Sequence, residues 1–87
     1  MVDTEVATQI REAMKRIASA MHSDSHIQLN KLTLATAIRK DYVWNGGHVP
    51  EDEECTTLVY GDEEGGVPET LKLKYPSTYA MIGTYYR

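Results

Sequence analysis

The stretch TEVATQIREAMKRIASAMH, residues 4–22, has the clearest periodic pattern of the chain. Its apolar side chains recur at the spacing of one helix face, at Val6, Ile10, Ala13, Met14, Ile17 and Met21. Glu5 lies in the first turn, where a carboxylate interacts favourably with the helix dipole. The pattern predicts an amphipathic helix over residues 4–22, with Ile10 and Ile17 buried.

Residues 27–44 fit two interpretations. Apolar residues at helical spacing, preceded by Asn30 or Thr33 as a cap, predict a second helix over residues 31–41. The β-branched residues of the same stretch also tolerate a strand. That strand would turn at the dipeptide Asn45-Gly46, which is a strong hairpin signal between two strands. We favour the helix.

The second half of the chain has the composition of β structure. Residues 55–60 are rich in Thr, Val and Tyr, residues 61–66 are typical of a turn, and residues 71–75 alternate apolar and polar side chains. Residues 79–86 carry β-forming residues on both faces. We therefore predict an α+β fold, with one or two N-terminal helices packed on a small C-terminal three-stranded antiparallel sheet. The last strand, apolar on both faces, predicts a homo-oligomer.

Length and composition narrow the class of protein. With 87 residues the chain predicts a single small domain, residues 1–87, and its single cysteine excludes an internal disulfide. A lone cysteine, no signal-peptide pattern and no long apolar run are typical of a cytoplasmic protein rather than a membrane protein. The net charge of −4 argues against long nucleic acid and anionic membranes as partners.

The acidic residues are concentrated in one segment. Eight carboxylates lie between residues 51 and 69, where there is no Lys or Arg. Acid runs in loops are often only solvated, but a dense block also creates a local field that attracts a basic surface. We predict that this segment docks a protein partner with a basic surface. The predicted partner-binding residues are Glu51, Asp52, Glu53, Glu54, Asp62, Glu63 and Glu64.

The aromatic composition supports an alternative function. The chain has six Tyr, one Trp and no Phe, and Tyr suits surfaces where one end of the ring stays in water. Such rings could stack on a nucleotide-like small molecule at a subunit interface, while basic side chains meet its phosphates. The candidate ligand-binding residues are Trp44, Tyr79, Tyr85, Tyr86, Arg39, Lys40 and Arg87.

Patterns for catalysis, metals and cofactors are weak. His22 and His26 are four residues apart, but Ser23-Asp24-Ser25 interrupts the helix on which they would share a face. Cys55 follows four acidic residues, which raise the pKa of a thiol and disfavour the reactive thiolate. We therefore predict a non-enzymatic interaction protein with no catalytic residues, no metal site and no cofactor.

Overall fold

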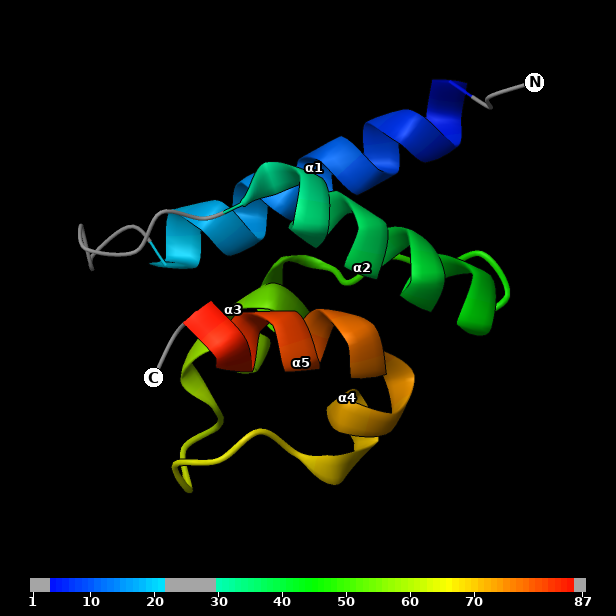
Figure 1. Ribbon diagram of the computed structural model, residues 1–87. Helices are drawn as coiled ribbons and strands as arrows, with labels where there is room; N and C mark the ends of the chain where they lie inside the picture. Colours follow the sequence, from blue (N-terminus) through cyan, green and yellow to red (C-terminus); the bar gives the residue numbers. More distant parts are fainter. Residues whose placement is uncertain (1–3, 22–29, 86–87) are drawn as a thin grey trace.

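The computed structural model describes residues 4–21 and 30–85. These residues form five helices and no strand (Figure 1), so the predicted α+β class with its three-stranded sheet is wrong. The helices are α1 (Thr4–Met21), α2 (Lys31–Trp44), α3 (Asp52–Tyr60), α4 (Glu69–Lys74) and α5 (Pro76–Tyr85). None of the helices in these ranges is long and apolar enough to cross a membrane.

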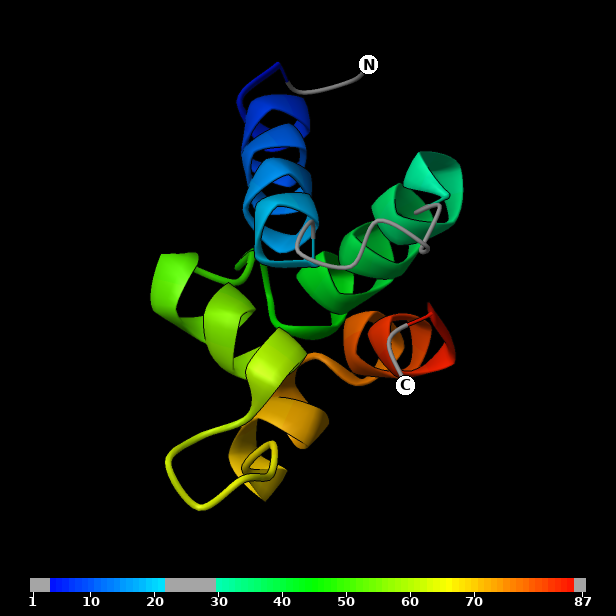
Figure 2. The same ribbon diagram turned by 90° about the vertical axis from the view of Figure 1, so that its left-hand side faces the viewer.

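Helix α1 confirms the amphipathic pattern. Ile10 and Ile17 are buried in the hydrophobic core, as predicted, together with Ala13 and Met21 of the same stripe. The helix packs against α2 on one side and against α3 on the other (Figure 2). The apolar stripe of α1 therefore lies in the core between α2 and α3.

Helix α2 is the helical one of the two predicted alternatives, and it continues three residues beyond residue 41. The side chain of Asn30 caps it, since Oδ1 accepts hydrogen bonds from the N–H groups of Leu32 (3.0 Å) and Thr33 (3.1 Å). Asn45 and Gly46 end this helix instead of forming a hairpin turn. Gly46 has a φ of 68°, a conformation that glycine adopts without steric cost.

Residues 55–60 form most of α3, so the strand predicted there is wrong. Glu51 and Glu54 make a capping box, and Asp52 and Glu53 place further carboxylates at the positive end of the helix dipole. These start signals outweigh the β propensity of the Thr and Val residues that follow. The buried side chains are Cys55, Leu58 and Val59, at the spacing of one helix face.

Residues 71–75 lie in and just after the short helix α4, so the second predicted strand is also wrong. Glu69 in the first turn and Lys72 and Lys74 in the last turn complement the helix dipole. The alternation of Lys72 and Lys74 with leucines resembles a strand pattern, but these residues form a helix whose ends carry complementary charges. Tyr75 follows α4 and is completely buried.

The third predicted strand, residues 79–86, is wrong because residues 79–85 lie in α5, which begins at Pro76, and residue 86 lies outside the described residues. Proline fits the first helical position, where its missing N–H would have no intrahelical partner. Thr78, Met81 and Ile82 are buried at helical spacing, and α5 packs along α2 (Figure 1). A strand apolar on both faces was the reason to expect self-association through residues 79–86. Because no such strand exists in the described residues, this reason no longer applies, and self-association stays a prediction.

The end of α2 forms hydrogen bonds with the corner between α4 and α5, where the chain turns at residues 73–78. The buried carboxylate of Asp41 accepts hydrogen bonds from the N–H groups of Ser77 (3.0 Å) and Thr78 (2.7 Å), which belong to the first turn of α5. Trp44 Nε1 donates to the carbonyl of Leu73 (3.1 Å), and the adjacent Asn45 Nδ2 donates to the carbonyl of Lys74 (2.5 Å). Backbone groups that α4 and α5 cannot satisfy internally therefore find partners on α2.

Replacing Asp41 with Ala should lower the free energy of unfolding by about 2–4 kcal/mol, since two buried N–H groups lose their acceptor and α5 loses its cap. Urea denaturation of the wild-type and variant proteins measures this difference. Arg39→Ala, at an exposed position of the same helix, is the control and should change stability by about 0.5 kcal/mol or less. Equal losses in the two variants would contradict the proposed role of Asp41.

Candidate functional site

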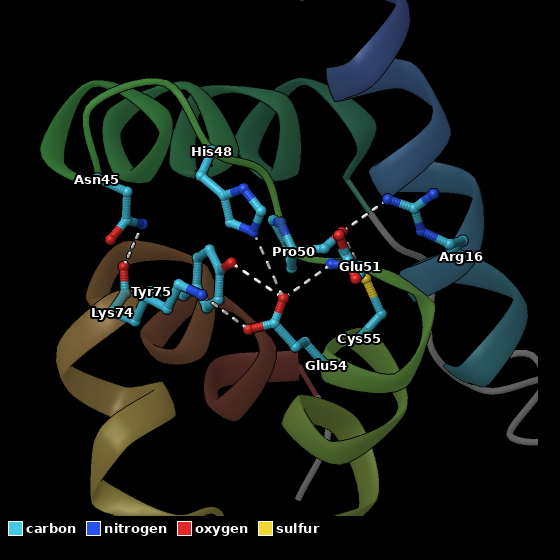
Figure 3. Close-up of polar contacts among 9 residues, drawn as sticks. All are labelled: Arg16, Asn45, His48, Pro50, Glu51, Glu54, Cys55, Lys74 and Tyr75. Carbon is cyan, nitrogen blue, oxygen red and sulfur yellow. Dashed lines mark hydrogen bonds and ion pairs between the residues drawn. The ribbon is translucent and has the colours of Figure 1, made fainter.

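Glu54 is the centre of a polar cluster that joins α3 to the α4–α5 corner (Figure 3). Its Oε1 accepts hydrogen bonds from the backbone N–H of Glu51 (3.1 Å) and from the hydroxyl of Tyr75 (3.2 Å). Its Oε2 accepts one from Lys74 Nζ (3.2 Å), and His48 Nε2 lies 3.8 Å from Oε1. One carboxylate therefore contacts four other residues, two of them more than 19 positions away in the chain.

These contacts shift the pKa values of the cluster. Burial acts to raise the pKa of Glu54, but the hydrogen bonds from Glu51, Lys74 and Tyr75 and the charge of Lys74 outweigh it, so the pKa lies below its ordinary value. The pKa of Tyr75 is raised, first by burial and then by the charge and the hydrogen bond of Glu54. Tyr75 therefore stays a protonated hydrogen-bond donor.

A second group of contacts lies beside this cluster. Arg16 Nη2 donates to the carbonyl of Pro50 (2.6 Å), and Cys55 Sγ lies 3.6 Å from the same oxygen (Figure 3). Burial raises the pKa of the Cys55 thiol, and the charges of Asp52 and Glu54 raise it further against the opposing effect of Arg16. The raised pKa values favour the neutral thiol of Cys55 and the neutral phenol of Tyr75. Both groups of contacts position the start of α3.

The other predicted partner-binding residues stay on the surface. Glu51, Asp52 and Glu53 are exposed at the start of α3, and Asp62, Glu63 and Glu64 are exposed in the loop after it. We call these six residues the acidic surface. None of them forms an ion pair with a described residue. Glu54 does not belong with them, because it is only partly exposed and is engaged by Lys74 and Tyr75. The sequence does contain a local signal that Glu54 has a structural role, namely the spacing of Glu51 and Glu54 that is typical of a capping box.

A groove beside the acidic surface extends its charge onto α1. Its volume is about 410 Å³, and it lies between α1 and the segment before α3. Glu5 and Glu12 from α1 and Glu51 from the opposite wall line it, together with Arg16 and His48. The lining therefore holds three carboxylates and one guanidinium, and one of the carboxylates, Glu12, is also paired with Lys15 (3.7 Å). The chain composition did not indicate that α1 would take part in this site.

The candidate ligand-binding residues are only partly brought together. Arg39, Lys40 and Trp44 are exposed on α2, whereas Tyr79 is half-buried on α5, with Lys72 Nζ 5.4 Å from its ring centre. Tyr85 ends α5, and its side chain lies outside the described part of the structure. Tyr86, Arg87 and the histidine pair His22 and His26 also lie outside it.

The described residues hold no group of three or more His, Cys, Asp or Glu side chains that could bind a metal ion. Comparisons of the chain with protein families, with curated proteins and with solved structures found no match. The geometry of the molecule is therefore the basis for a proposed function.

Replacing Glu54 with Gln should lower the free energy of unfolding by about 1–2 kcal/mol at neutral pH. Because the folded-state pKa of Glu54 is depressed, its contribution is present above the unfolded pKa of about 4.3 and is lost as the pH falls through the folded value. The difference between wild type and variant should therefore shrink in acid. Urea denaturation of both proteins at neutral and acidic pH tests this expectation.

Glu53→Gln is the matched control, since Glu53 is the exposed neighbour of Glu54 in the same helical turn. The difference between this control and the wild type should stay small across the same pH range. A Glu54→Gln difference as large in acid as at neutral pH would contradict a role for the ionised carboxylate.

Proposed function

We propose that this chain is a non-enzymatic, cytoplasmic interaction protein that docks a basic protein partner through the acidic surface. The observation that carries the proposal is the exposure of six carboxylates without a cationic partner among the described residues. Carboxylates without a neutralising cation leave a negative field at the surface, which steers a cationic partner and fixes its orientation. An inhibitor or an accessory protein would use such a surface.

The supporting structure is well suited to docking, because it holds Glu51, Asp52 and Glu53 at the start of a helix that is fixed at both ends. Helix α3 is tied to the α4–α5 corner by the Glu54 contacts, and its far end is tied to α1 by a hydrogen bond from the Tyr60 hydroxyl to the carbonyl of Ala20. A preorganised surface loses less conformational entropy when a partner binds. The groove between α1 and Glu51 gives a long basic side chain a place to enter.

The two parts of the acidic surface, residues 51–53 and residues 62–64, differ in whether their acidic side chains have a structural role. Asp52 and Glu53 stabilise the start of α3 through the helix dipole whether or not a partner binds. Glu63 and Glu64 lie in a loop, where their side chains have no such structural reason. The loop end is therefore the more informative place to test docking.

The alternative function, a nucleotide-like ligand held at a subunit interface, has weaker support. Its aromatic candidates Trp44 and Tyr79 lie on different helices, and Lys72 lies over the ring of Tyr79. Stacking on a base needs the open face of a ring. The acidic surface is therefore the better supported of the two sites.

Charge reversal tests the proposal. The wild-type protein is used to capture partners from a host extract, and a purified captured protein is then titrated at low and high salt. Glu63→Lys combined with Glu64→Lys should weaken binding about tenfold or more, and binding to the wild type should weaken as salt rises. Isothermal titration calorimetry measures both effects.

Glu69→Lys, compared with the single reversal Glu63→Lys, is the control for charge alone, because each changes the net charge by +2 and Glu69 is exposed on α4, where it pairs with Lys72. Glu69→Lys should weaken binding much less than Glu63→Lys. Salt-independent binding, or equal losses for the loop and α4 variants, would contradict docking through the acidic surface.

A further inference from the structure

Helix α2 carries an exposed apolar surface that the core does not use. Leu32, Val43 and Trp44 are 76%, 78% and 71% exposed, and Leu73, whose carbonyl accepts the Trp44 hydrogen bond, is 70% exposed. These are four of the five large apolar side chains that are exposed among the described residues. Val43, Trp44 and Leu73 lie together at the end of α2, and Leu32 lies about three turns away on the same helix. A group of large exposed apolar side chains is typical of interaction sites.

The exposed charges on the same helix are all positive. Lys31, Arg39 and Lys40 are exposed, and none of them forms an ion pair with a described residue. The single acidic residue of α2, Asp41, is buried and bonded to the start of α5. The outer face of α2 is therefore positively charged, although the whole chain has a net charge of −4.

The exposed side chains form a stripe along the helix. Leu32, Thr36, Lys40 and Val43 recur at the three- and four-residue spacing of one helix face, and the stripe is ~17 Å long at 1.5 Å per residue. A groove of about 390 Å³ runs beside it between α2 and α5. Thr36 and Lys40 line one wall of the groove, and Ser77 and Met81 line the other.

We infer that the outer face of α2 docks an acidic amphipathic helix of a partner protein. Apolar side chains of that helix would lie against Leu32 and Val43 and enter the groove beside α5. Its carboxylates would pair with Arg39 and Lys40. The indole of Trp44 would be a rigid contact at the end of the stripe, because its Nε1 is already bonded to the Leu73 carbonyl. Rigid aromatic side chains of this kind often contribute most to interface affinity.

The chemistry of the stripe favours a protein over the other anionic partners. Nucleic acid needs many cations to neutralise phosphates, whereas the outer face of α2 has only Lys31, Arg39 and Lys40, with the apolar Leu32 and Val43 among them. The acidic surface elsewhere on the molecule also repels a long polyanion. A short helix with both carboxylates and apolar side chains matches both components of the stripe. This docking site is separate from the acidic surface and does not depend on it.

The test uses the full chain and two synthetic amphipathic helical peptides with leucines at identical positions. One peptide carries Glu and the other carries Lys at every remaining exposed position. Trp44 is the single tryptophan of the chain, so its fluorescence reports directly on binding at this site. The Glu peptide should produce a saturable blue shift of the emission, and the Lys peptide should produce none.

Two double variants separate the α2 face from general charge. Arg39→Glu with Lys40→Glu should weaken binding of the Glu peptide about tenfold or more. Arg11→Glu with Lys15→Glu makes the same change of charge on exposed positions of α1, and should weaken binding much less. Leu32→Ser with Val43→Ser should also weaken binding, and each variant keeps Trp44 as the reporter.

The same fluorescence titration with duplex DNA and with phosphatidylglycerol vesicles distinguishes other classes of partner. Tighter binding of either one than of the Glu peptide would overturn the inference. Absence of a shift with the Glu peptide, or equal shifts with the Glu and Lys peptides, would overturn it as well. Equal losses in the α1 and α2 charge variants would show attraction by net charge alone, which also overturns it.

Discussion

The arrangement of this molecule depends on hydrogen bonds from side chains at the end of α2 to backbone groups at the corner between α4 and α5. A helix leaves backbone N–H groups at its start and carbonyls at its end without partners, and burying them unpaired costs free energy. Asp41 accepts hydrogen bonds from the start of α5, and Trp44 and Asn45 donate to the carbonyls at the end of α4. Two short helices thus become stable in one orientation relative to a longer one.

Glu54 extends the same constraint to α3. Its carboxylate contacts Tyr75 and Lys74 at the corner and the backbone of Glu51 at the start of its own helix. The corner between α4 and α5 is therefore held from two directions, by the last turn of α2 and by the first turn of α3. This explains why an acidic residue in the middle of an acidic segment has a structural role, while its neighbours face the solvent.

The same contacts separate the charges on the surface. Because Asp41 is buried, the outer face of α2 shows only its cations. The carboxylates gather at both ends of α3 and continue onto α1 through Glu5 and Glu12. A chain of moderate net charge thus has two surfaces of opposite character, one acidic and one both apolar and cationic. Both proposed docking sites depend on this separation of charge.

The sequence by itself determined the helices whose apolar side chains follow one clear stripe or a recognisable cap. Helix α1 has the stripe, and α2 has Asn30 as its cap, so both could be predicted from local patterns. The concentration of carboxylates in residues 51–69 was also visible directly. Local patterns failed in the second half because the β propensity of Thr, Val and Tyr was given more weight than two helix start signals, the Glu51–Glu54 capping box and Pro76.

Only the tertiary structure decided that α3, α4 and α5 are helices and which acidic residues are exposed. The groups that stabilise α4 and α5 come from Asp41, Trp44 and Asn45, about 30 or more positions away in the chain. No local window contains both the helix end and its partner. For the same reason the sequence could not show that Glu54 is engaged by Tyr75 or that α1 completes the acidic groove, since these depend on elements meeting in space.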